Sequence, residues 1–107
     1  MGYPGEFELL TLLAVARLGD DAYGVTVRDT MEARTSRSVT LGAIYKTLGR
    51  LESKGLVQVT VAPPTSERGG RRKKMYTLTT DGREAVRSSL SDLRHLAQGL
   101  APELKAP

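Results

Sequence analysis

The feature that limits the fold most is a pair of short strand-like segments, the first rich in β-branched residues, in a chain whose other periodic stretches are helical. The first segment, 56–61, alternates Val with polar residues, and the second, 75–78, reads Met-Tyr-Thr-Leu. Between them lies a loop that begins near Pro63 and Pro64. Alternation with β-branching predicts strands. We therefore expect one β-hairpin with a long tip inside a mostly helical chain.

Two helices are predicted before the hairpin from apolar spacing. The first covers 6–18, where Leu and Ala recur at helical intervals, and the run 19–21, Gly-Asp-Asp, ends it. The second covers 23–34. One face of this second helix carries three large side chains one turn apart, which are Tyr23, Val27 and Met31.

A third helix is predicted over 41–54 and a fourth from about residue 80 to Leu100. Thr40 is the expected N-cap of the third helix, because a hydroxyl can accept from an unpaired backbone N–H of the first turn. Gly55 is its expected C-terminal cap. Val39 is expected to add a short strand. The resulting order is helix, helix, helix, strand, loop, strand, helix, which is the winged helix-turn-helix topology with an added C-terminal helix. The expected class is α+β, mostly α, in one structural domain.

The net charge of +4 is concentrated in seven residues of the hairpin loop. The run 68–74, Arg-Gly-Gly-Arg-Arg-Lys-Lys, holds five of the sixteen basic side chains. The rest of the chain has eleven basic and twelve acidic groups. A cationic loop on a nearly neutral body suits a polyanion, and duplex DNA is the leading candidate. Gly69 and Gly70 permit a tight turn and leave N–H groups open to phosphate. The run alone also fits a solvated loop, or a segment that binds heparin or polyphosphate.

The third helix separates into an apolar stripe and an unusual opposite face. The stripe, expected in the core, comprises Leu41, Ile44, Leu48 and Leu51. The opposite face mixes small residues with two cations and comprises Gly42, Ala43, Lys46, Thr47, Gly49, Arg50 and Ser53. Small residues would let a helix enter the major groove, and the cations would reach phosphates or guanine edges. A solvated face remains the alternative when the helix is taken alone.

The fourth helix carries apolar residues spaced four, three, four, three, a heptad pattern that suits packing against another helix. These residues are Val86, Leu90, Leu93, Ala97 and Leu100. We expect this apolar seam to form a homodimer interface. The alternative is that the seam packs on the first helix of its own chain.

Several classes of function are disfavoured by composition. The chain has no Cys and one His, so no metal site, cofactor or His-based catalysis is expected. The acids at 20–21, 29 and 32 are expected in a turn and on a solvated helix face, so an enzyme is not expected. The N-terminus does not resemble a signal peptide, and no apolar run is long enough for a membrane span. We expect a soluble cytoplasmic protein associated with the nucleoid.

The residues collected above are similar to those of the PadR-like bacterial transcriptional regulators. The similarity covers about residues 5–100. Its most specific parts are 41–57, Leu-Gly-Ala-Ile-Tyr-Lys-Thr-Leu-Gly-Arg-Leu-Glu-Ser-Lys-Gly-Leu-Val, and the junction 76–83, Tyr-Thr-Leu-Thr-Thr-Asp-Gly-Arg. Gly5 to Leu10 and Tyr23-Gly24 add to it. The chain is expected to be a short member with a single C-terminal helix.

The resemblance implies a homodimer that binds a pseudo-palindromic promoter site in double-stranded DNA, as a repressor. Region 1–79 would bind DNA, with helix 41–54 in the major groove and the wing 63–74 on the backbone or minor groove, while 80–107 would dimerise. The expected DNA-binding residues, including the cap Thr40, are Tyr23, Thr40, Gly42, Ala43, Tyr45, Lys46, Arg50, Arg68, Gly69, Gly70, Arg71, Arg72 and Lys73.

Two departures from the family pattern matter. Lys46 stands where many members have Pro, which adds a cation and weakens an exact transfer of contacts. The chain has no Trp, so the flat drug pocket of some short members is not expected, and the existence of a small-molecule effector is left open. A second function also stays open, that of a winged-helix module whose basic wing binds an acidic protein partner.

Overall fold

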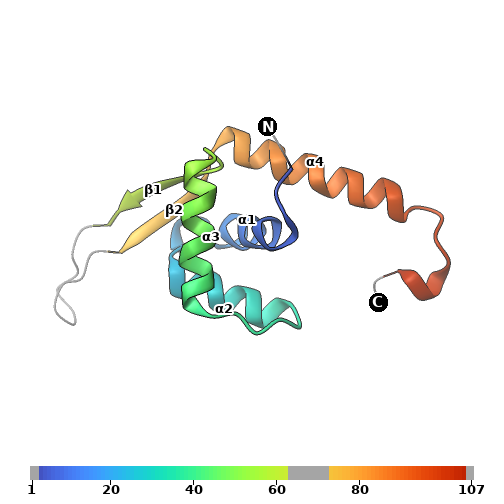
Figure 1. Ribbon diagram of the computed structural model, residues 1–107, viewed down its shortest axis with the longest axis horizontal. Coiled ribbons are helices and arrows are strands. Elements are labelled where there is room, and N and C mark those ends of the chain that lie inside the picture. The colour runs from blue at the N-terminus through green and yellow to red at the C-terminus, as the bar shows by residue number, and fades with distance from the viewer. Residues whose placement is uncertain (1–2, 63–72, 106–107) are drawn as a thin grey trace.

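The computed structural model describes residues 3–62 and 73–105 and confirms the order of elements (Figure 1). A 3-10 turn, Gly19–Asp21, separates α1 from α2, and another, Pro102–Leu104, follows α4. The main elements are α1 (Glu6–Leu18), α2 (Gly24–Arg34), α3 (Leu41–Ser53), β1 (Val57–Val61), β2 (Lys74–Leu78) and α4 (Thr80–Ala97). The fold is therefore a mostly helical α+β winged helix-turn-helix, with a long C-terminal helix that projects from the body.

The core lies where α1, α2 and α3 meet one face of the hairpin. Its largest fully buried side chains come from all three helices and include Leu12, Val15, Val27, Ile44, Leu48 and Leu51. Burying a Leu or Ile fully contributes about 1.5–3 kcal/mol to folding. Because α3 supplies three of these side chains, its opposite face is left to point away from the body.

The buried face of α1 differs from the apolar spacing in the sequence. Leu12 and Val15 are buried together with the polar Glu8 and Thr11, whereas Leu10 and Leu13 are only half-buried. The hydroxyl of Thr11 donates to the carbonyl of Phe7 at 2.8 Å, which satisfies it inside the core. The outer leucines instead line a groove between α1 and α2.

The hairpin is antiparallel, and its register pairs Val57 with Leu78 and Val61 with Lys74. Tyr76 faces the core as expected and is buried, and Leu78 packs at the edge of the core. The backbone N–H of Tyr76 donates to the carbonyl of Ala22 at 2.8 Å, outside the hairpin. The wing is thus attached to the segment that precedes α2.

The start of α4 is pinned against the turn between α3 and β1. The hydroxyl of Thr79 accepts from Gly82 N–H at 3.0 Å and donates to the carbonyl of Gly55 at 2.7 Å. A methyl group on Gly82 would lie 2.0 Å from the carbonyl oxygen of Leu56. Gly82 is therefore required for the close approach of α4, which explains the Thr-x-x-Gly spacing at this junction.

Three local expectations are changed by the structure. Val39 forms no strand: its side chain is buried, and its N–H donates to the Glu32 carboxylate at 2.9 Å, so the backbone is paired without a neighbouring strand. Helix α3 ends at Ser53, and Gly55 follows with a positive φ of 76°. Helix α4 ends at Ala97, because the chain turns out of the helix at Gln98.

Candidate nucleic-acid interface

Helix α3 contains five of the thirteen predicted contact residues. Gly42, Lys46 and Gly49 are exposed, and 48% of the Tyr45 side chain is accessible. A methyl group on Gly42 or Gly49 would meet no atom within 4 Å. The protein itself therefore has no steric need for either glycine, and both positions are open to close approach by a ligand.

Thr40 caps this helix at the N–H of Ala43. The hydroxyl oxygen of Thr40 accepts from the N–H of Ala43 at 3.1 Å, as predicted for an N-cap. Thr40 is exposed and Ala43 half-buried. Both lie at the N-terminal end of α3, where the unpaired N–H groups of the first turn favour an anion such as phosphate.

Thr47 was expected on the outward face, and that prediction was wrong. It is 2% exposed, beside Ile44 and Leu48. The apolar stripe of a packed helix spans 100° or more, and α3 packs against α1, α2 and β1. The broader contact draws Thr47 into the buried surface, while Leu41 at the first turn remains half-buried.

Arg50 lies on the flank of α3 that faces α1. Its Nε is 3.6 Å from Oε2 of Glu8, and its Nη2 donates to Oγ1 of Thr47 at 3.3 Å. Half of the Arg50 side chain stays accessible. The guanidinium is thus oriented by its own protein and still exposed to a ligand.

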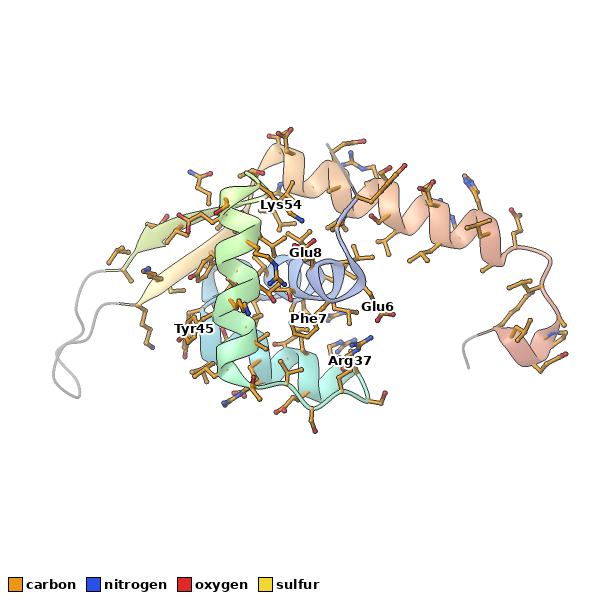
Figure 2. The ribbon with its side chains drawn as sticks, viewed as in Figure 1. Glu6, Phe7, Glu8, Arg37, Tyr45 and Lys54 are labelled. Carbon is orange, nitrogen blue, oxygen red and sulfur yellow. The ribbon has the colours of Figure 1, made fainter. Side chains whose placement is uncertain are left out.

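Glu8 is a residue that the sequence interpretation missed. Both of its carboxylate oxygens accept from Lys54 Nζ at 2.9 Å, and Oε1 also accepts from Gly5 N–H at 3.0 Å. Figure 2 shows Glu8 and Lys54 on one side of α3 and Tyr45 on the other. An acid among the apolar residues of α1 was the available signal, but its partner lies 46 positions away.

Burial by itself raises the pKa of the Glu8 carboxyl. The hydrogen bonds from Lys54 and Gly5, with the charges of Lys54 and Arg50, more than offset it and hold the pKa below the ordinary value. Glu8 is therefore ionised at neutral pH, and it links the start of α1 to the last turn of α3.

A stability prediction follows for Glu8. Because the folded pKa is lowered, the ion pair stabilises the protein above the unfolded pKa, and this contribution is lost as pH falls through the folded pKa. We expect Glu8→Gln to lower the free energy of unfolding by about 1–3 kcal/mol at pH 7 and by much less at about pH 3. Urea unfolding at both pH values measures this. Glu84→Gln, which breaks an exposed pair with Arg87, is the control and should cost less than about 1 kcal/mol. An equal loss at both pH values would contradict the electrostatic account.

The flank of α3 nearest the hairpin borders a groove of about 580 Å³. Its lining includes Tyr23, Tyr45, Gly49, Lys73 and Tyr76. The ammonium of Lys73 lies 4.3 Å from the centre of the Tyr23 ring, a cation–π distance. The groove therefore brings α3, the start of α2 and the base of the wing to one surface.

Of the predicted wing residues, the structure describes Lys73, which is exposed just before β2. The other five, Arg68, Gly69, Gly70, Arg71 and Arg72, lie outside the described residues. Lys74, the first residue of β2, is also exposed. Two cations at the base of the hairpin thus border the same groove as α3.

The predicted apolar seam of α4 divides into two parts. Val86 packs at the edge of the chain's own core, together with Ala85 and the buried Ser89. Farther along, Leu90 and Leu93 are exposed by 44% and 56%, and Leu96 by 80%. Ala97 and Leu100 are exposed as well. The body of the chain therefore covers the start of α4 and leaves its C-terminal leucines exposed. This end of α4 projects away from the body (Figure 1).

A substitution at Gly49 separates folding from ligand binding. Gly49→Ala should raise the free energy of unfolding by up to about 1 kcal/mol, because Gly disfavours a helix interior and the added methyl has room. The same methyl should weaken DNA binding about fivefold or more if α3 lies against the duplex. Thermal unfolding and a DNA titration give the two effects. Ser91→Ala on α4 is the control, with unchanged DNA affinity expected. A stabilised variant that binds DNA as the wild type does would contradict contact at this position.

Within residues 3–62 and 73–105, no helix is long and apolar enough to cross a membrane. In the same ranges, no three His, Cys, Asp or Glu side chains gather as a metal site. Comparison with curated proteins found no significant match.

Solved structures give close matches to the fold. A PadR family transcription regulator from hypervirulent Clostridium difficile is 23% identical, with a TM-score of 0.74 over 88% of this chain and 93% of that one. A PadR-like transcription factor from Bacteroides fragilis is 20% identical, with a TM-score of 0.72 over 86% and 84%. RosR of H. salinarum is 26% identical, with a TM-score of 0.69 over 92% and 81%.

A family model described as the transcriptional regulator PadR-like family matches residues 12–88, most of the chain. The matched region runs from Leu12, in the middle of α1, through α3 and the wing into α4. With its winged helix-turn-helix fold and its outward cationic α3, the chain belongs to the PadR-like family of DNA-binding transcriptional regulators, and not to a family of enzymes.

Proposed function

We propose that the protein is a homodimer that represses transcription by binding a pseudo-palindromic site in double-stranded DNA. The observation that carries the proposal is the shared surface of α3 and the hairpin base. Lys46, Arg50 and two exposed glycines lie on α3, and Lys73 and Lys74 border the groove beside it. One helix with little steric bulk and cations on either side fits a major groove flanked by phosphates.

In this proposal each part of the surface has a separate task. The outward face of α3 reads base edges, with Lys46 and Arg50 reaching guanine or phosphate. Tyr23, Tyr45, the end of α3 at Thr40 and the basic wing contact the backbone, which positions the protein without reading sequence. Residues 63–72, the expected wing tip, add the positive charges of three arginines for contact with phosphates.

The dimer part of the proposal is supported by the uncovered leucines of α4. Leu90 and Leu93 lie on one side of α4, and Leu100 is exposed just past the end of that helix; a second copy of the chain would cover them. The groove between α1 and α2, lined by Leu10, Leu13 and Met31, is another apolar surface that a second copy could reach. Region 1–79 then binds DNA and region 80–107 joins the two chains, both within one structural domain. Two-fold symmetry would place the two α3 helices roughly 34 Å apart, one turn of duplex.

A mobility-shift titration at physiological salt tests sequence-specific binding. The DNA upstream of the protein's own gene is compared with a random duplex of equal length. We expect the upstream DNA to bind at least about a thousandfold more tightly. Equal affinity for both duplexes would contradict a sequence-specific regulator.

Repression is tested separately by transcription in vitro from a promoter that overlaps the bound site. Added protein should lower the transcript, because a bound dimer and the polymerase compete for the same DNA. A rise in transcript would show activation instead, while leaving DNA binding intact.

A further inference from the structure

Residues 22–24, which lead into α2, contact both elements that border the groove. The carbonyl of Ala22 accepts from Tyr76 N–H of β2 at 2.8 Å. The Tyr23 ring lies 4.3 Å from the Lys73 ammonium at the base of the wing. Gly24, the first residue of α2, is buried against the Tyr45 ring of α3. Residues 22–24, called the joint below, therefore connect α3 and the wing.

Gly24 is in the joint because of space and not because of backbone conformation. Its φ does not fall in the left-handed region that favours glycine. A Cβ at this position would lie 2.5 Å from three atoms of Tyr45, namely Cε1, Cζ and the hydroxyl oxygen. Any residue with a Cβ at this position would therefore displace the Tyr45 ring.

The orientation of Tyr45 matters because its ring is at the edge of the outward face. About half of the side chain is accessible, and the ring end lies at the start of α2, beside the groove. A phenol hydroxyl can donate to a phosphate oxygen. A ring already held in one position loses less side-chain freedom on binding than a free one.

We propose that Gly24 is a positioning residue for DNA binding: its missing side chain seats the Tyr45 ring against α2 and fixes where the Tyr45 hydroxyl meets the duplex. This rests on the proposed DNA-binding function and adds to it a residue that acts through another. This contact between Gly24 and the Tyr45 ring, called the seat below, also fixes the position of α3 relative to residues 22–24, which anchor the wing.

The test compares Gly24→Ala, Tyr45→Ala and the double variant. The probes are a duplex selected by the wild-type protein from a random pool and a random duplex of equal length. Each single variant should bind the selected duplex about tenfold more weakly, as for one lost hydrogen bond to a charged group. The double variant should be no weaker than Tyr45→Ala, because both changes remove the same contact. Wild-type affinity of Gly24→Ala, or losses that multiply in the double variant, would overturn the proposal.

Gly5→Ala is the matched control, because its added methyl meets nothing closer than a Glu8 oxygen at 3.9 Å. It should leave affinity for the selected duplex unchanged. Any drop in the melting temperature of Gly24→Ala should come from the clash of its methyl group with the Tyr45 ring. The double variant lacks that ring, so its melting temperature should equal that of Tyr45→Ala. A double variant that fails to fold would overturn the steric seat.

Ring-labelled tyrosine NMR without DNA tests the seat independently. The chain has four Tyr residues, so each ring can be assigned by substitution. In Gly24→Ala the Tyr45 resonances should shift while those of the distant Tyr3 stay in place. Unchanged Tyr45 resonances would overturn the seat even if DNA binds. Equal wild-type affinity for both duplexes would contradict the proposed function, whereas the ring resonances would still report on the seat.

Discussion

Replacing Leu93 by Glu is expected to convert the proposed dimer into a monomer and to weaken operator binding about a hundredfold or more. More than half of the Leu93 side chain is accessible in the single chain, so the substitution should not disturb the monomer fold. In the proposed dimer the carboxylate would be buried among leucines without a partner. An unpaired buried charge costs several kcal/mol, more than one helix contact contributes.

In the proposed dimer, loss of dimerisation weakens operator binding because two linked copies would read the two half-sites. Once one copy is bound, the second reading helix is held near its half-site at a high effective concentration, which raises the overall affinity by about a hundredfold to ten-thousandfold. A monomer loses this gain while each α3 remains intact. Binding to a single half-site should therefore be almost unchanged.

Sedimentation at micromolar concentration measures the oligomeric state, and titrations with one and two half-sites measure the binding. Ser91→Glu is the control, because it adds the same carboxylate to α4 on the side roughly opposite Leu93. It should remain dimeric and bind the operator. A Leu93→Glu protein that still sediments as a dimer would show that another surface pairs the chains, and a monomeric wild type would contradict the dimer altogether.

Replacing Lys46 and Arg50 together by Ala will weaken operator binding by at least about thirtyfold. A contact from Lys or Arg to a guanine edge contributes about 1–3 kcal/mol of discrimination, and the loss of a phosphate contact lowers the slope of the salt dependence by about one unit. Both effects should appear, since Lys46 is exposed and Arg50 half-exposed on α3.

This pair of substitutions also separates DNA binding from the alternative of an acidic protein partner on the wing. A module that docks through its wing would tolerate the change on α3, whereas a DNA-reading helix would not. Arg17→Ala with Arg87→Ala is the control, because it removes the same charge from α1 and α4 and should have a small effect. Because Arg50 contacts Glu8, the melting temperature of the α3 variant is compared with that of Glu8→Gln. Unchanged affinity and salt slope in a folded variant would contradict a DNA-reading α3.

Local features of the chain were predictable from the sequence because they depend on neighbours a few residues apart. Thr40 caps α3 as expected, and Gly55 follows that helix with positive φ. The alternation of 56–61 and 75–78 marks the hairpin, and the helical periodicity marks α1 to α4. The concentration of charge in 68–74 is a property of the sequence itself.

Which side chains meet across the fold could be decided only by the tertiary structure. Periodicity placed Thr47 outward, but packing of α3 against three other elements buries it. The pairing of Glu8 with Lys54 and the contact of Gly24 with Tyr45 join residues that are far apart in sequence.

The sequence by itself thus determined the element order, the caps and the charged loop, because hydrogen bonds and periodicity within a segment suffice for these. Only the tertiary structure decided the buried face of α1, the orientation of Arg50 and the seat of Tyr45. Each of these depends on the distance and angle between two helices, and those are set by the packing of the whole core.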